Sequence, residues 1–166
     1  VADLSEWWDG QKHIELLDAN ILACRDRNEL LVQLIDSNAR VNFNQGLDAR
    51  FIDKDVALLL NRVKKDKVHF AFDFMRNEEK ITEGLRIYRD VCCPNPRNTI
   101  VYMLTNFNTA FAEDWYRICA IREAGYYPDV RIYRKESLPK RHILRDLQRW
   151  CNNRFLYNSV DFWDYK

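Results

Sequence analysis

Polar side chains, most of them amides, carboxylates and guanidinium groups, lie at the end of each of five strand-like segments of this chain or just after it. In chain order they are Asp18 and Asn20, then Asn44, Gln45, Asp48 and Arg50, then Asp73 and Arg76, then Asn106, Asn108 and Thr109, and finally Arg134 and Lys135. Ligands of parallel α/β folds bind beyond the carboxyl ends of the strands, so we expect these groups to form a ring around a polar ligand. For any one of them taken alone, capping a helix or bonding a loop backbone is the simpler role.

The chemistry of the ring follows from its side-chain types. Amides donate and accept, which suits ribose hydroxyls or the edge of an adenine. Arg50 is suited to a carboxylate through two parallel hydrogen bonds, and Asp73 to an ammonium group or a diol. The chain has only 4 glycines, so a small-molecule site must be built mostly from side chains rather than from a glycine-rich loop.

Several other chemistries lack their motifs. The chain contains no GxSxG, GxxxxGK[ST] or GxGxxG sequence. Its three histidines lie far apart, and none of its five cysteines forms a CxxC or a Cys/His pair with zinc spacing, so we predict no metal site and reduced thiols. His69 is the one histidine placed to face a ligand, although a structural role is the simpler interpretation.

The elements that must position the ring alternate along the chain. The strand-like segments are 13–19, 41–47, 68–74, 99–107 and 129–134, and the helix-like segments are 26–38, 53–65, 77–92, 110–125 and 138–155, the last with Pro139 in its first turn. Five strands alternating with five helices predict βαβ units with a parallel sheet in one α/β domain spanning residues 1–166.

The strands alternate in polarity, which distinguishes between arrangements of the sheet. Val68, Phe70 and Phe72 share one face of their strand, whereas His69 and Asp73 share the other. A sheet covered by helices on both faces would be nearly all apolar. We therefore expect one apolar face under a helix layer. The polar face has two possible explanations. It is the inner face of a curled, incomplete barrel that holds a polar ligand, or it is the face of a single-layer sheet that is exposed to solvent or covered by a partner.

The order of these segments resembles the radical S-adenosylmethionine (radical SAM) enzymes. ELLDAN at 15–20 looks like the second strand of that family, and NQGLDARFIDKDVALLL at 44–60 is similar to its third unit. FAFDF at 70–74, MLTNFNTAFAEDWYRICAIREAG at 103–125 and PDVRIYR at 128–134 resemble the units that follow, with Asn106 and Asn108 in place of the usual glycines. The resemblance covers roughly residues 13–134 and implies about five βα units of an incomplete, partial TIM barrel.

The resemblance also implies a cofactor. The family binds a [4Fe–4S] cluster through CxxxCxxC on the loop after its first strand, and none of the five cysteines has that spacing. The chain thus resembles the C-terminal part of the barrel without the cluster loop, which we expect to precede residue 1, and should be inactive in radical chemistry on its own. The resemblance implies that Asn44, Gln45 and Arg50 lie near SAM or the substrate and that Asp73 lies near SAM, with Asn106, Asn108 and Thr109 near its adenosyl group. Catalytic residues stay unassigned.

The substrate stays open from the sequence. Subfamilies that modify tRNA, such as the catalytic subunit of Elongator and the methylthiotransferases, are among those the resemblance suggests. The alternative is a non-catalytic α/β module that binds RNA or a protein partner through the arginine-rich segment 141–155, although a solvated amphipathic helix explains that segment more simply. The net charge of +1 gives no general reason to expect nucleic acid. With no apolar run of membrane-spanning length and no signal sequence, we expect a cytoplasmic location.

Overall fold

A computed structural model describes residues 3–165 of the chain. The strands are β1 (His13–Leu16), β2 (Arg40–Phe43), β3 (Val68–Ala71), β4 (Thr99–Thr105) and β5 (Tyr127–Ile132). The α-helices are α1 (Arg27–Asp36), α2 (Lys54–Arg62), α3 (Glu78–Cys92), α4 (Phe111–Glu123), α5 (Ile143–Asn152), α6 (Arg154–Ser159) and α7 (Phe162–Tyr165), with short 3-10 turns η1 (Leu4–Glu6), η2 (Ile21–Ala23), η3 (Ala49–Phe51) and η4 (Lys135–Ser137). The α/β class and the alternation of strands with helices are confirmed.

The strands are all parallel, and their order in space follows their order in the chain. β1 pairs with β2, and β3, β4 and β5 form a three-stranded ladder. Two isolated parallel bridges, Val41 with Lys65 and Leu47 with Phe70, join the two parts between β2 and β3. The described strands do not close into a barrel, because β1 and β5 each have a neighbour on one side alone.

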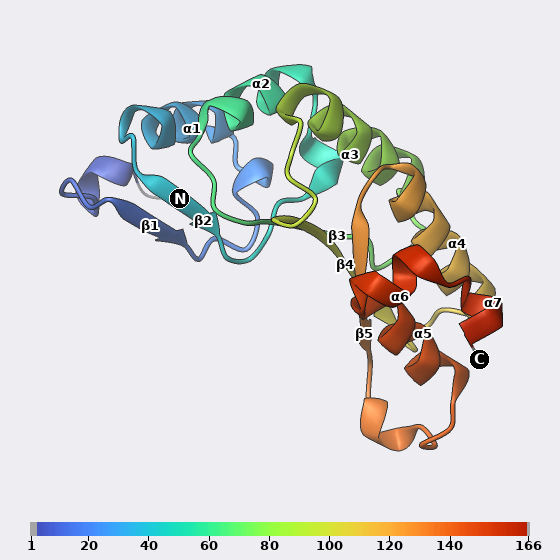
Figure 1. Ribbon diagram of the computed structural model, residues 1–166. Helices are drawn as coiled ribbons and strands as arrows, with labels where there is room; N and C mark the ends of the chain where they lie inside the picture. The colour runs from blue at the N-terminus through green and yellow to red at the C-terminus, as the bar shows by residue number, and fades with distance from the viewer. Residues whose placement is uncertain (1–2, 166) are drawn as a thin grey trace.

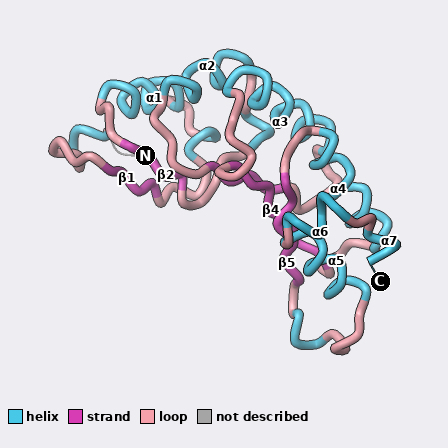
Figure 2. The backbone as a smooth tube through the Cα atoms, in the orientation of Figure 1, coloured by secondary structure: helices cyan, strands magenta, loops and turns pink. Residues whose placement is uncertain are grey.

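The helices lie on one side of the strands, as Figure 1 shows for α1 to α4 along the outside of an arch. The strands follow the inner, concave side of the same arch (Figure 2). Val41, Phe43, Phe70, Val101 and Val130 face the helices and are buried. Each such side chain contributes roughly 1.5–3 kcal/mol through its burial.

The opposite, concave face keeps the polar residues that the strand pattern places there. Glu15 is exposed, whereas Asn42, His69 and Asp73 are half-buried. The predicted alternation of an apolar and a polar face is therefore confirmed.

The C-terminal segment differs from its prediction. A single helix over 138–155 is wrong: α5 begins after His142, whose Nδ1 accepts from the Leu144 amide, and its last helical residue is Asn152. The Asn153 side chain then accepts from the amides of Phe155 and Leu156 and starts α6. Pro139 lies in the preceding loop rather than in the first turn of the helix.

Helix α5 packs as an amphipathic helix and protects the outer edge of β5. Leu144, Leu147 and Trp150 are buried. Asn152 accepts from the Val130 amide at 2.8 Å and donates to the Val130 carbonyl at 3.1 Å. Side-chain amides thereby occupy backbone groups that an open sheet edge would expose.

Asparagine supplies backbone conformations that glycine often provides. Six non-glycine residues in the described part of the chain have positive φ, and four of them are Asn38, Asn77, Asn106 and Asn108. Asparagine is among the residues that tolerate the left-handed region best. The low glycine content is therefore compatible with tight turns, including the turn after β4 where Asn106 has φ 62° and Asn108 has φ 55°.

Candidate functional site

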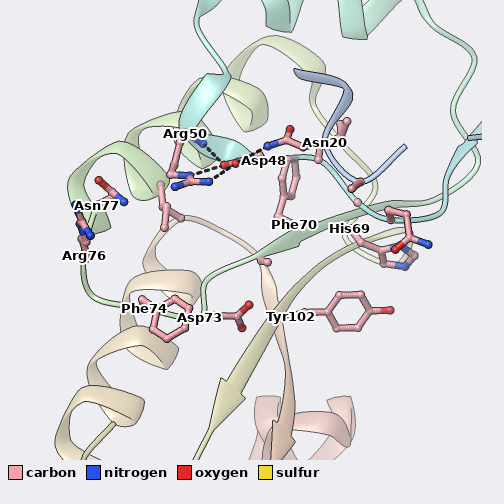
Figure 3. Close-up of a pocket in the computed structure, with 16 residues that line it drawn as sticks. Asn20, Asp48, Arg50, His69, Phe70, Asp73, Phe74, Arg76, Asn77 and Tyr102 are labelled. Atoms are coloured by element: carbon pink, nitrogen blue, oxygen red, sulfur yellow. Dashed lines mark hydrogen bonds and ion pairs between the residues drawn. The ribbon is translucent and has the colours of Figure 1, made fainter. Parts of the chain in front are cut away.

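A cavity of about 960 Å³ lies at the carboxyl ends of β1, β2 and β3. Figure 3 shows polar side chains from separate loops around it. Asn20 comes from the loop after β1, Gln45, Asp48 and Arg50 come from the segment after β2, and Asp73 comes from the segment after β3. The cavity is thus built where parallel α/β folds place their ligands.

Asp48 and Arg50 form a two-point ion pair in the cavity wall. Arg50 Nε donates to Asp48 Oδ1 at 2.8 Å, and its Nη2 donates to Oδ2. Asn20 Nδ2 also donates to Asp48 Oδ2, at 2.9 Å (Figure 3). Partial burial alone would raise the pKa of Asp48, but the hydrogen bonds and charge of Arg50, together with the Asn20 amide, outweigh it and lower that pKa.

Helix α3 holds this ion pair in place through a close backbone contact. Asp48 caps η3 by accepting from the Arg50 amide, and η3 rests on α3 at Gly84. A Cβ atom at Gly84 would lie 1.9 Å from the Ala49 carbonyl oxygen. Only glycine allows the helix to approach this closely.

Asp73 is held at the end of β3 by the backbone of β4. Its Oδ1 accepts from the Leu104 amide at 2.8 Å, continuing the β3–β4 pairing beyond the last strand residue. No hydrogen bond to Oδ2 is present among residues 3–165, and the carboxylate lines the cavity (Figure 3). One oxygen of Asp73 therefore anchors it, and the other is available to a ligand.

A buried arginine on α4 ties together the strand ends that carry Asp73. Arg117 donates to the carbonyls of Phe72 at 2.7 Å, Asp73 at 2.8 Å and Leu104 at 2.9 Å. It also pairs with Asp114, and both side chains are at most 1% exposed. Burial raises the pKa of Asp114, a shift that the Thr109 hydroxyl and Arg117 oppose.

Polar side chains continue across the concave face. Asn42 on β2 donates to both carboxylate oxygens of Glu15 on β1, at 3.0 and 3.1 Å. The His69 ring stacks on Tyr102 with 5.0 Å between centroids, and Arg131 lies 5.4 Å from the Tyr102 ring. Burial, aided by the charge of Lys67, lowers the pKa of His69, so its ring is favoured in the neutral form.

The structure brings together only some of the residues expected at the site. Gln45, Arg50 and Asp73 line the cavity, as do Asn20, Asp48 and Arg76 from the same expected ring. Asn44 is exposed in the turn after β2, and it does not line the cavity. The turn with Asn106, Asn108 and Thr109 lies outside the lining as well.

Arg50 was expected to bind a ligand carboxylate through two parallel hydrogen bonds. In the structure its guanidinium group already makes two such bonds to Asp48. Sequence reasoning missed Arg117, Gly84 and Tyr102. Arg117 follows Asp114 by three residues in a predicted helix, and that spacing was the available signal.

The cysteines do not contribute to this cavity. Cys151 is buried, Cys93 is exposed and the other three are half-buried. Burial raises the pKa of Cys92 to about 11. Within residues 3–165, no group of three or more His, Cys, Asp or Glu side chains is arranged to hold a metal ion.

None of the helices described between residues 3 and 165 has both the length and the apolar character needed to cross a membrane. Comparisons with protein-family models, with curated proteins and with solved structures give no match.

Proposed function

We propose that this chain supplies the SAM-binding part of a radical-SAM-like partial TIM barrel. One observation carries the proposal: a polar cavity lies at the carboxyl ends of sequentially ordered parallel strands whose helices lie on one side. The strand order is that of neighbouring units in a (β/α) barrel. The resemblance of segments 15–20, 44–60, 70–74, 103–125 and 128–134 to that family supports the same assignment.

The cavity lining fits SAM chemically. SAM carries a carboxylate, an ammonium group, a ribose diol and an adenine. Among the described residues, Arg50 Nη1 has no hydrogen-bond partner and suits the carboxylate, although Asp48 holds the rest of the guanidinium. Asp73 Oδ2 suits the ammonium group or the diol, and the Gln45 amide can donate and accept. Asn106, Asn108 and Thr109 would form an outer contact to the adenosyl group rather than part of the cavity wall.

The iron–sulfur cluster does not fit the side chains of the described chain. None of the cysteines lines the cavity, and residues 3–165 hold no three-ligand group for it. With a cluster, SAM supplies a 5′-deoxyadenosyl radical in the family that the sequence resembles. The residues described here would bind and orient SAM, and the thiolates for the cluster would come from outside them.

Calorimetric titration of the chain with SAM tests the binding. We expect saturable binding that weakens about tenfold in Asp73→Asn and in Arg50→Gln, since each removes one charged contact. The amide introduced by Asp73→Asn keeps an acceptor for the Leu104 amide, so this variant leaves the β3–β4 pairing intact. Arg40→Gln, at an exposed arginine that pairs with Asp66, is the control and should bind SAM normally. No saturable binding, or equal losses in all three variants, refutes the proposal.

The radical chemistry needs a separate experiment. The reading frame that includes sequence upstream of residue 1 would be expressed anaerobically, assayed for iron and sulfide, and incubated with SAM and a reductant. The proposal predicts a CxxxCxxC motif upstream, a cluster and formation of 5′-deoxyadenosine. A longer protein that carries no cluster contradicts it.

A further inference from the structure

We propose that the segment from Arg134 to Arg149, with the aromatic cluster beside it, is a binding surface for single-stranded RNA. The aromatic cluster consists of Phe74, Phe107 and Tyr133. The inference deepens the proposed function by naming a substrate class, and it rests on that function only in taking the RNA to be the substrate.

The charge of the chain is concentrated in this segment. Six cations lie between residues 134 and 149 with two carboxylates, Glu136 and Asp146, which gives a net charge of +4 in 16 residues. The whole chain carries +1, so the other 150 residues carry −3. The near-neutral total therefore conceals a strongly basic region, the kind of electrostatic footprint that attracts a phosphate backbone.

These cations have no acidic partners in the described structure. The ion pairs within residues 3–165 involve Arg27, Arg40, Arg50, Arg89, Arg117 and Arg131, and none of these belongs to the segment. Arg134, Lys135, Lys140, Arg141 and Arg149 are exposed. Asp129 neutralises the neighbouring Arg131, so the free charge begins at Arg134.

The segment is held in a defined shape. Arg145 donates to the carbonyls of Lys135, Leu138 and Pro139, which fixes the loop against α5. A hollow of about 470 Å³ is lined by Lys135, Lys140, Arg145 and Arg149, among others. In Figure 1 this loop and η4 extend beyond the end of β5, at the lower end of the molecule. The loop can therefore present several cations to a phosphate without first becoming ordered.

The aromatic cluster connects this basic segment to the cavity. The Cζ atom of Arg134 lies 5.3 Å from the centroid of the Tyr133 ring. The ring centroids of Phe107 and Tyr133 are 4.8 Å apart, and those of Phe74 and Phe107 are 6.1 Å apart. Phe74 is 49% exposed and lines the cavity, and Tyr133 is 37% exposed. The three rings follow β3, β4 and β5, so they share one edge of the sheet.

Phosphate-binding cations beside exposed rings are the two components of a single-strand binding surface, because bases stack on aromatic faces while cations follow the backbone. An acidic protein or an anionic lipid would also use the cations, but neither requires a row of rings that continues from the cations to a polar cavity. RNA is favoured over DNA because proteins read RNA mainly through the unstacked bases of single-stranded loops and ends, which stack on aromatic rings and guanidinium planes such as those of Tyr133 and Arg134.

Fluorescence anisotropy with a labelled mixed-sequence 15-nucleotide RNA, in the absence of SAM, tests the proposal. We expect Lys140→Glu/Arg141→Glu to weaken binding at least tenfold and to reduce the slope of log K against log salt by about 0.7 for each phosphate that is no longer neutralised. Lys80→Glu/Arg86→Glu makes the same change of net charge on exposed positions of α3, and it should stay within twofold. Tyr133→Ala should weaken binding on the order of tenfold because one base no longer stacks.

Competing ligands and the SAM titration separate the outcomes. DNA of the same sequence and a heparin fragment of matched charge should bind more weakly than the RNA. Equal losses of RNA affinity in the two double variants overturn the proposal. Heparin binding as tight as RNA, with no effect of Tyr133→Ala, overturns it as well. Equal affinity for DNA and RNA overturns the choice of RNA. Lys140→Glu/Arg141→Glu should still bind SAM, so a failure of SAM binding with RNA binding intact rejects the proposed function alone.

Discussion

Replacing Arg117 by methionine should destabilise the fold strongly, because it leaves Asp114 charged or protonated in a site that is 1% exposed. Breaking a buried ion pair by removing one partner costs about 3–5 kcal/mol. Without Arg117, the Asp114 carboxyl can take up a proton instead of staying charged. The free energy of protonating it is therefore the most that the unpaired carboxyl can add to the loss of stability. With an ordinary value of 3.8 for this carboxyl, holding it neutral costs at most about 4.4 kcal/mol at pH 7, at about 1.36 kcal/mol per pH unit.

At pH 5, holding the Asp114 carboxyl neutral costs at most about 1.6 kcal/mol. Burial already raises the pKa of Asp114, and loss of Arg117 raises it further. The folded state then binds more protons than the unfolded state, so the variant loses stability as pH rises from 3.8 through the raised pKa. The free energy of unfolding that Arg117→Met loses relative to the native chain should therefore be smaller at pH 5 than at pH 7, by up to about 2.7 kcal/mol.

Urea unfolding at both pH values, followed by circular dichroism, measures this difference. The thermal midpoint of Arg117→Met should fall by about 6–20 °C at pH 7, at about 2–4 °C for each kcal/mol. The double variant Asp114→Asn/Arg117→Met has no carboxyl to protonate and should lack the recovery at pH 5. A cost below about 1 kcal/mol at pH 7, or the same recovery in the double variant, would show that the buried charge does not set the penalty.

Three further changes test the elements around the cavity. Gly84→Ala should destabilise the fold by about 1–3 kcal/mol in urea unfolding and weaken SAM binding, since its Cβ would meet the Ala49 carbonyl; Gly10→Ala meets nothing within 4 Å, so it should cost only the strain of a side chain at φ 79°, about 1–2 kcal/mol, and leave SAM binding unchanged. Asn108→Gly should leave the free energy of unfolding nearly unchanged, whereas Asn108→Val should lower it by about 1–2 kcal/mol because φ is 55° at this position. Equal thermal midpoints for the two variants would contradict this expectation. Since burial lowers the pKa of His69, the native chain should lose stability as pH falls from 6.5 through that lowered pKa, and His69→Gln should lose this dependence in unfolding curves.

Local patterns were sufficient for most of the fold. Strand alternation and helix spacing are set within a few residues, so the five strands, the first four helices and the polar concave face were predictable. The C-terminal helix was predicted too long because His142 and Asn153 compete with its continuation through their own capping bonds. Such a competition depends on side-chain geometry, which hydrophobic spacing does not contain.

The sequence by itself determined which residues follow each strand, because parallel strands always bring their carboxyl ends to one edge. Only the tertiary structure decided which of them meet: Gln45, Arg50 and Asp73 share the cavity, whereas Asn44 and the Asn106–Thr109 turn lie outside its lining. It also decided that Arg50 is bound to Asp48 and that, within residues 3–165, the cations after β5 form no ion pair. Pairings between distant residues depend on strand curvature and on close contacts such as Gly84 with Ala49, and neither composition nor net charge records them.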